Sequence, residues 1–363
     1  MTAMSELNAR RMLALTKAAL LGTIPDENLF LNIGETEWNE LFEQSAVQGV
    51  MVLSFTGAMR LAKELQPPPA LKLRWIASVE TVEKRYRHRL ETAKKLAAYF
   101  KENNIQMLLF KGIALSRLYP EPSSREFGDI DIFLCGKATE GDALLQRFTD
   151  RSCHSSEKHV NFSYKGILIE NHHTFLNHAG YKSFHRSEDL EKRLMTALTD
   201  ADRVEDTLLF PPPDFDALFV TLHMLAHLPN KIVLRHLCDL AVLFTAYQGR
   251  IDFPVYRNTL SEAGLTKLAD ALISLAIRYL GLNPEYAPPH ESDVALEDRI
   301  WNDMLNPLRP KKKSNLIAVF QYKTRLLWTN RWKYELVFPG KFWKRNLHSA
   351  FFHILHPGVI GKL

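Results

Sequence analysis

The sequence predicts an α+β protein in which a small mixed sheet lies between two helical regions. Apolar residues recur every three or four positions from Ser5 to Asn104, which favours helices. Short apolar runs bounded by turn residues follow between 106 and 186, and helical periodicity returns from Ser187. The 363 residues are 46% hydrophobic and 24% charged, a globular composition whose length suggests two or three packed units.

Periodicity and composition divide the chain into four expected regions. These are a helical N-terminal region at 1–105, a core with strands at 106–186, a helical domain at 187–308 and a basic, aromatic tail at 309–363. Within the first region, Pro67-Pro68-Pro69 interrupts the helical pattern. The stretch from Ala70 to Asn104 then predicts one long helix.

The core alternates strand and helix signals. We expect strands over 106–110, 129–134, 159–164 and 167–174, and helices over 112–119 and 139–150. The two-residue connection Lys165-Gly166 is typical of a hairpin between the last two strands. A further extended piece, 207–210, precedes Pro211-Pro212-Pro213.

Two aspartates of the second strand carry the strongest chemical signal. Residues two apart project from the same face of a strand, so Asp129 and Asp131 place two carboxylates side by side while Ile130 and Ile132 face the other way. Hard cations such as Mg²⁺ or Mn²⁺ prefer carboxylate oxygens together with substrate phosphates. Glu170 ends an apolar run where an unpaired charge is costly, and it is the expected third ligand of a two-ion site.

Residues around these carboxylates are candidates for substrate binding. Lys111 and Gly112 lie where a strand turns into a helix, a position suited to phosphate, and Arg125 offers a forked donor to a triphosphate. Strand alternation places His172 on the face of Glu170, either against metal or substrate or as a hydrogen-bonded partner of a ligand.

Two histidines one helical turn apart, His223 and His227, have a zinc spacing, but Met224 stands where the zinc hydrolase motif needs Glu. We instead expect both histidines, with Arg235 and Asp239, to be polar groups where helices close over the site. A purely structural Arg–Asp network between helices is an equal alternative.

Residues 108–134, LLFKGIALSRLYPEPSSREFGDIDIFL, resemble a bacterial nucleotidyltransferase family of the DNA polymerase beta superfamily, with lysine-glycine in place of the usual glycine-serine. ILIENHHTF is similar to that family's acidic-histidine strand, and LFVTLHMLAHL and LRHLCDLAVLF are similar to its helical half. The resemblance implies a polymerase-beta-like core, a metal triad of Asp129, Asp131 and Glu170, and a phosphate-contacting turn at Lys111-Gly112. The 17-residue interval from Gly112 to Asp129 is longer than usual for the superfamily.

The activity that this resemblance implies is metal-dependent transfer of a nucleoside monophosphate from an NTP, ATP among the candidates, to a hydroxyl acceptor, with release of pyrophosphate. One alternative is a descendant that binds a nucleotide or a partner without turnover. A glycosyltransferase that holds a sugar nucleotide with its DxD motif is disfavoured, because such folds place a parallel sheet where this chain is helical. No P-loop, kinase, GxSxG or GxGxxG motif occurs.

Charge is distributed unevenly along the chain. Residues 309–363 hold 12 Lys or Arg and one acid, whereas the rest holds 34 basic and 40 acidic residues. Basic and aromatic residues together suit an anionic membrane surface or RNA, and a tail packed on its own protein is the alternative. Three cysteines without a pairing pattern and no apolar run of about 18 residues predict a cytoplasmic protein, in the membrane-binding case peripheral to the inner face.

Overall fold

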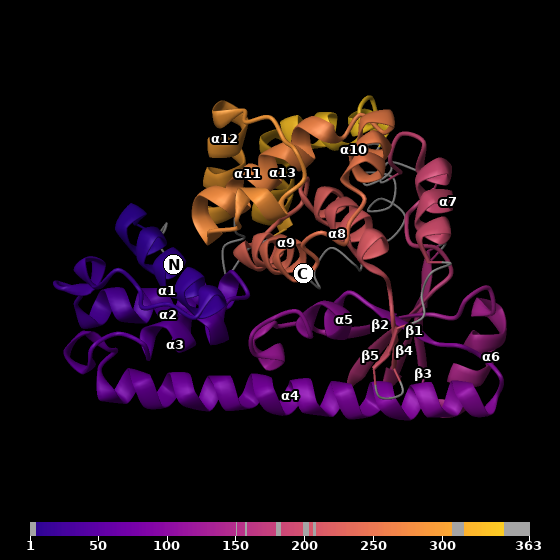
Figure 1. Ribbon diagram of the computed structural model, residues 1–363, viewed down its shortest axis with the longest axis horizontal. Coiled ribbons are helices and arrows are strands. Elements are labelled where there is room, and N and C mark those ends of the chain that lie inside the picture. Colours follow the sequence, from indigo (N-terminus) through magenta and orange to yellow (C-terminus); the bar gives the residue numbers. More distant parts are fainter. Residues whose placement is uncertain are drawn as a thin grey trace.

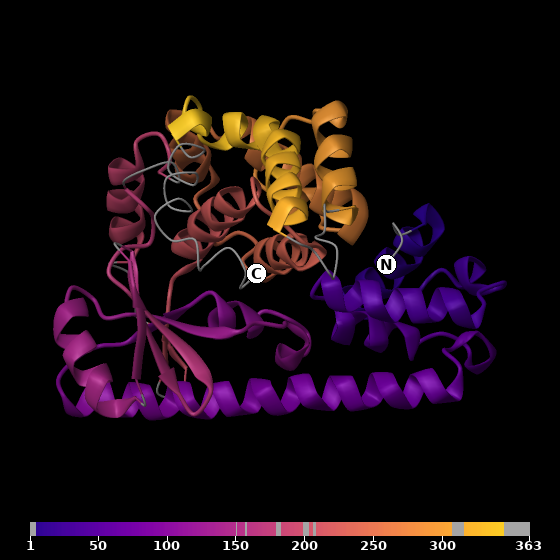
Figure 2. The same cartoon turned by 180° about the vertical axis from the view of Figure 1, so that it is seen from behind.

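The computed structural model describes residues 5–149, 151–156, 158–178, 183–198, 203–205, 208–306 and 316–344. Within these residues, helices at both ends of the chain enclose a mixed sheet, so the predicted α+β class is confirmed. Figures 1 and 2 show three parts: a small group of N-terminal helices, the sheet, and a larger group of C-terminal helices that lies above both.

The N-terminal part consists of four helices: α1 (Glu6–Leu21), α2 (Glu35–Val47), α3 (Met51–Ala58) and α4 (Pro69–Glu102). Local sequence sets their ends. The Ser5 side chain accepts the N–H of Asn8 at the start of α1, and Gly22 ends that helix in the left-handed conformation. The predicted proline break is confirmed, since α4 starts at Pro69, where its missing N–H costs nothing.

Helix α4 connects the N-terminal helices to the sheet. Its 34 residues make it about 50 Å long, and it runs beneath both parts (Figure 1). Near its start, Trp75 is buried under α1–α3 and donates its indole N–H to the Met51 carbonyl oxygen at 3.1 Å. Near its end, Leu96 and Phe100 are fully buried in the core beneath the sheet. One helix therefore supplies core residues to both parts.

The sheet contains seven strands among the described residues. They are β1 (Leu108–Phe110), β2 (Asp129–Phe133), β3 (Arg151–Ser155), β4 (His159–Tyr164), β5 (Ile167–His172), β6 (Arg203–Glu205) and β7 (Leu208–Phe210). Their order is β3-β4-β5-β2-β1-β7-β6, with β2–β5 and β1–β7 parallel and the other pairs antiparallel. The connecting helices are α5 (Gly112–Ser116) and α6 (Ala138–Phe148).

The predicted hairpin between β4 and β5 is confirmed. Tyr164 pairs with Ile167, and both turn residues, Lys165 and Gly166, have positive φ, as a two-residue hairpin turn requires. Two strands were not predicted, β3 and β6, which lie at the two edges of the sheet. The predicted extended piece at 207–210 becomes β7 and pairs with β1, so the sheet includes residues beyond position 186.

The two faces of the sheet pack against different partners. On one face, Ile130 and Ile132 of β2 pack in a core with α4 and α6. On the opposite face, Phe110 and Phe175 contact each other and Phe219 of helix α8 (Pro213–His227), with ring centroids 5.2–5.8 Å apart. Asp129 and Asp131 have the opposite parity to the two isoleucines, so they lie on the face that is turned toward the helical half.

The helical half contains α7 (Ser187–Ala197), α8, α9 (Leu234–Ala246), α10 (Phe253–Glu262), α11 (Thr266–Leu280), α12 (Val294–Leu305) and α13 (Leu316–Val337). One apolar core runs from α1 through these helices, with α1 against α11. Gln48, which follows α2, also joins the parts: its Nε2 donates to the Met304 carbonyl oxygen and its Oε1 accepts the N–H of Leu234.

Part of the basic tail packs on the protein's own body. Tyr334, Phe338 and Phe342 are buried against the helical half, as the packing alternative predicts. Trp328 and Trp343 remain 56% and 57% exposed. Residues 309–315 and 345–363 of the tail lie outside the described residues. Of the helices that the structure describes, none combines the length and apolar character needed to cross a membrane.

Candidate functional site

Three carboxylates lie on two neighbouring strands, although among the described residues their oxygens do not all lie within 4.8 Å of one another. Asp131 of β2 is paired in register with Glu170 of β5, and Asp129 is two residues earlier on the same face. The His172 Nε2 lies 2.9 Å from Asp131 Oδ1 and 3.3 Å from Glu170 Oε2. Those two carboxylate oxygens are therefore no more than about 6 Å apart, a separation that suits a shared two-ion cluster.

Lys111 reaches this group from the turn between β1 and α5. Its backbone has φ 54° and ψ −121°, an uncommon conformation for a side-chain-bearing residue. Strain of this kind is retained where the surroundings demand it. Its Nζ lies 2.5 Å from Asp131 Oδ1, the oxygen that also faces His172. Burial alone would raise the pKa of Asp131, but Lys111 and His172 outweigh it and hold that pKa below its usual range, so Asp131 is ionised.

The second oxygen of Asp131 has no partner. Oδ2 is buried and accepts no hydrogen bond from the residues that the structure describes. An ionised oxygen left in this way is costly unless a cation completes its surroundings. Carboxylate oxygens are the donors that Mg²⁺ and Mn²⁺ prefer. The orphaned oxygen is thus the observation that matches the residues present to a divalent ion.

The surroundings of Asp129 disfavour the ionised form of its carboxyl group. Burial, and after it the charge of Asp131, raises the pKa of Asp129 to about 6, although Lys111 opposes this shift. A carboxyl group whose folded pKa is raised destabilises the fold when it is ionised. At neutral pH without metal, the charge on Asp129 therefore costs stability.

We expect Asp129→Asn to raise the melting temperature of the metal-free protein at pH 8. The gain should shrink as pH falls through 6 and vanish near 3.8, because below that value the wild-type carboxyl is protonated in both the folded and unfolded states. Thermal melting in a chelator between pH 8 and pH 4 measures this. The same change at exposed Asp298 is the control, and a pH-independent gain at Asp129 contradicts the prediction.

A second donor set overlaps the first. Ligand atoms of His159, Glu170 and His172 all lie within 4.8 Å of one another, and His159 pairs with His172 in the β4–β5 hairpin. Burial lowers the pKa of His159 to about 4, so its ring is neutral and able to ligate. His159 was not among the predicted site residues. The hairpin spacing contained the signal, since a two-residue turn at Lys165-Gly166 sets positions 159 and 172 opposite each other.

Lys158 is another residue that the sequence analysis missed. It lines the same cavity, and burial followed by the charge of Lys111 lowers the pKa of Lys158 to about 7. Asp131 and Glu170 oppose that shift, which places this lysine near the carboxylates. No sequence pattern points to it, because it belongs to the short connection between two strands.

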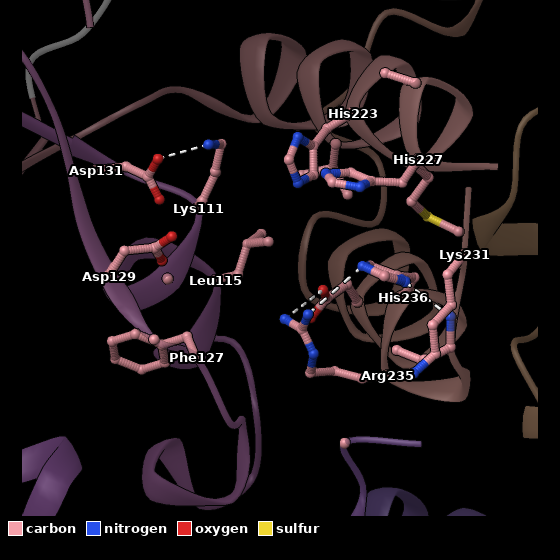
Figure 3. A pocket seen from close by; sticks show the side chains of 18 of the residues that line it. Lys111, Leu115, Phe127, Asp129, Asp131, His223, His227, Lys231, Arg235 and His236 are labelled. Carbon is pink, nitrogen blue, oxygen red and sulfur yellow. Dashed lines mark hydrogen bonds and ion pairs between the residues drawn. The ribbon is translucent and has the colours of Figure 1, made fainter. Parts of the chain in front are cut away.

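The carboxylates open into a cavity of about 1230 Å³. The sheet wall carries the carboxylates and Lys111. The wall across from it is formed by α8, α9 and the connection between them, with His223, His227, Lys231, Arg235 and His236 (Figure 3). Ala46, Val47 and Gly49 of the N-terminal part and Lys344, beyond α13, also line the cavity. The cavity thus lies where all three parts of the protein meet, with the carboxylates and two lysines on the sheet side.

Arg125 lines the cavity, but its guanidinium is engaged elsewhere. Its Nε and Nη2 donate to the two oxygens of Asp239 on α9 at 2.7 and 2.9 Å, and Nη1 donates to the Gly112 carbonyl oxygen at 3.2 Å. Tyr119 donates to the same carboxylate at 2.7 Å. Both charges of the pair are buried, at 5% and 3% exposure. The guanidinium that the sequence analysis expected to face a triphosphate is therefore engaged in a buried ion pair, and the arginine that pairs closely with Asp239 is Arg125 rather than the expected Arg235.

Gly112 has a packing reason to be glycine. A Cβ atom there would lie 3.0 Å from the Phe127 ring and 3.4 Å from the Asp129 carbonyl oxygen. Glycine therefore lets α5 approach the strand that carries the aspartates.

His223 and His227 have ring centroids 4.5 Å apart, yet no further Cys, His, Asp or Glu of the described chain completes a metal cluster with them.

The site is thus a pair of parallel strands that carry carboxylates, with a helical half that closes over them. A family model described as "Uncharacterised nucleotidyltransferase" matches residues 34–281. The chain belongs to this family of nucleotidyltransferases, and the match covers the sheet, the cavity and most of the helical half. Neither the curated proteins nor the solved structures that were compared gave a match.

Proposed function

We propose that the protein transfers a nucleoside monophosphate from an NTP to a hydroxyl acceptor. The acceptor oxygen forms a bond to the α-phosphorus, the bond to the β-phosphate oxygen breaks, pyrophosphate leaves and the hydroxyl proton is lost to solvent. The observation that carries the proposal is the buried, unpartnered Asp131 Oδ2 in register with Glu170. Family membership supports nucleotidyl transfer over the glycosyltransferase alternative.

Asp129, Asp131 and Glu170 are the proposed ligands of two Mg²⁺ or Mn²⁺ ions. Bound there, the ions supply charge stabilisation for the transferring phosphoryl group and activation of the attacking hydroxyl. His172 holds the side chains of Asp131 and Glu170 in place, because its Nε2 lies between them. Its proposed role is orientation of ligands rather than direct contact with substrate.

Lys111 is the proposed phosphate contact on the sheet wall. Burial opposes its charge, yet Asp131, Asp129 and Glu170 raise the pKa of Lys111, so it stays cationic. Because its Nζ contacts Asp131 where an ion is expected, we propose that it shifts to the phosphates when substrate and metal enter. Arg125 stabilises this turn by donating a hydrogen bond from Nη1 to the Gly112 carbonyl oxygen.

Lys111→Met should weaken NTP binding by about 10- to 100-fold, the value of one charge-assisted hydrogen bond. Mn²⁺ affinity should not fall, because the lysine competes with the ion for Asp131 Oδ1. Calorimetric titrations with Mn²⁺ alone and with Mn²⁺ plus NTP separate the two effects. Lys267→Met, at an exposed lysine paired with Asp293, is the control. Equal NTP affinity in wild type and variant would contradict the proposal that Lys111 contacts the phosphates.

Activity is tested by incubating cell extract with the protein, Mg²⁺ and each α-labelled NTP, followed by identification of the labelled product. Label should appear in one acceptor with wild type and be absent with Asp131→Asn. If no NTP labels any acceptor while Mn²⁺ and NTP still bind, the non-catalytic alternative holds. Contact with a membrane or RNA through 309–363 stays a prediction, with Trp328 and Trp343 as its exposed aromatic residues.

A further inference from the structure

The wall opposite the carboxylates carries its own group of cations and donors. Lys231, Arg235 and His236, here called the helical-wall site, line the cavity at the start of α9 (Figure 3). They face the sheet wall across the cavity, and the proposed transfer reaction gives them no role. The chemistry of each group shows what ligand they would take.

The charge of Arg235 is not neutralised by the nearest carboxylate. Asp239 accepts two hydrogen bonds from Arg125 and one from Tyr119, so its oxygens are already occupied. The nearest contact of Arg235, from Nη1 to Asp239 Oδ2, is 3.9 Å, beyond hydrogen-bond distance. Two arginines thus share one carboxylate, and Arg235 makes no hydrogen bond to it.

A second acid, Glu126, lies near Arg235 without pairing with it. Arg235 influences its pKa, after burial and a backbone hydrogen bond, so the two groups are near each other. However, Glu126 Oε1 accepts the Met51 N–H at 3.1 Å, and the two side chains form no ion pair in the described part of the chain.

His236 adds a donor that lacks an acceptor. Its Nδ1 accepts the Val233 N–H at 3.0 Å, so the neutral ring carries its proton on Nε2. Burial and then the charge of Arg235 lower the pKa of His236 to about 3, which keeps the ring neutral. Nε2 lies 3.5 Å from Arg235 Nη2, itself a donor. Two N–H donors therefore converge with no acceptor between them in the part of the chain that the structure describes, although His236 is only 8% exposed. An oxyanion would satisfy both.

The backbone holds this wall in place. The Gln48 carbonyl oxygen accepts the Arg235 N–H at 3.1 Å and its side chain accepts the Leu234 N–H at 2.8 Å. Gly49 gives the Arg235 side chain room, because a Cβ there would lie 3.3 Å from it. The site is thus built before any ligand arrives, which lowers the cost of binding.

The cavity also has room for two ligands. Its volume of about 1230 Å³ exceeds the range of roughly 300–1,000 Å³ that is usual for one drug-sized ligand. The sheet wall already offers Lys111 and Lys158 to the phosphates of the NTP. We propose that Lys231, Arg235 and His236 bind an oxyanion of the acceptor, so that the acceptor is a hydroxyl compound bearing a phosphate or carboxylate group. This inference rests on the proposed transfer activity.

The test is calorimetric titration of inorganic phosphate into the full chain saturated with Mg²⁺ and tripolyphosphate, which stands in for the triphosphate of any NTP. Phosphate should bind to this saturated protein. Arg235→Met should weaken phosphate binding by about tenfold or more and leave tripolyphosphate affinity within about twofold. Arg235→Lys should restore part of the loss, and Arg278→Met, at an exposed arginine paired with Asp298, should change neither affinity. Lys231→Met repeats the test without touching the contact to Asp239.

The inference is overturned if phosphate fails to bind the saturated wild type. It is also overturned if Arg235→Met weakens tripolyphosphate binding, because that result would assign the helical-wall site to the NTP. Failure of the transfer proposal has a different signature. In that case Asp131→Asn leaves Mg²⁺-dependent tripolyphosphate binding unchanged, whatever phosphate does at the helical wall.

Discussion

Asp131→Asn is expected to lower nucleotidyl transfer by on the order of 10³-fold or more while the fold persists. The amide keeps the shape of the side chain but removes the charge that Lys111 and His172 share and that the proposed ions need. Several kcal/mol of transition-state stabilisation depend on such ions, and about 1.4 kcal/mol is a factor of ten in rate. The measurement is label transfer from the NTP, with circular dichroism to establish folding.

Metal-dependent melting gives an independent reading of the same variant. Mn²⁺ with NTP should raise the melting temperature of the wild type more than that of Asp131→Asn, since a ligand that binds only the native state stabilises it. Asp298→Asn makes the same chemical change on the surface of α12 and should behave as wild type. An equal metal-dependent shift in wild type and Asp131→Asn would remove the carboxylates from the metal site.

Arg125→Met is expected to lower the free energy of unfolding by about 3–5 kcal/mol, because it leaves the buried Asp239 charge without its bidentate partner. The pair joins the loop before β2 to α9, so the loss should be global and visible in urea unfolding. The double variant Arg125→Met/Asp239→Leu should regain part of the loss, since an apolar pair carries no desolvation cost.

The matched control for the buried pair is an exposed one. Arg278→Met removes a surface pair with Asp298 and should cost no more than about 1 kcal/mol. If Arg125→Met costs as little as Arg278→Met, the buried pair does not hold the two parts of the protein together.

Local patterns predicted the carboxylate strand well. The alternation of acid and isoleucine in 129–132 fixed which side chains share a face, and the structure places Ile130 and Ile132 in the core behind the sheet. The long helix and the hairpin also followed from local signals, a proline break and a two-residue turn. Edge strands β3 and β6 were missed because their sequences, RSCHS and RVE, lack the apolar run that marks a buried strand.

Contacts between distant parts of the chain could not be predicted in the same way. Arg125 looked like a phosphate donor, but its partner Asp239 is 114 residues away, and only the packing of α9 against the sheet brings them together. Lys158 and His236 belong to no recognisable sequence motif. Their pKa values are lowered by burial and by charged neighbours, which include residues on other elements of the fold. The chemistry of such groups depends on tertiary structure, which periodicity does not encode.

The length of α4 determines which fragments of this protein can exist on their own. A chain cut at 106, where the strand signals begin, would lose Leu96 and Phe100, which are fully buried beneath the sheet. The back of the sheet would then present its isoleucines to water, a liability for aggregation rather than a soluble domain. A chain ending at 105 would carry the same apolar stripe without a sheet to cover it. The sheet is therefore inseparable from the helix that precedes it, and a fragment meant to contain a folded sheet must include α4.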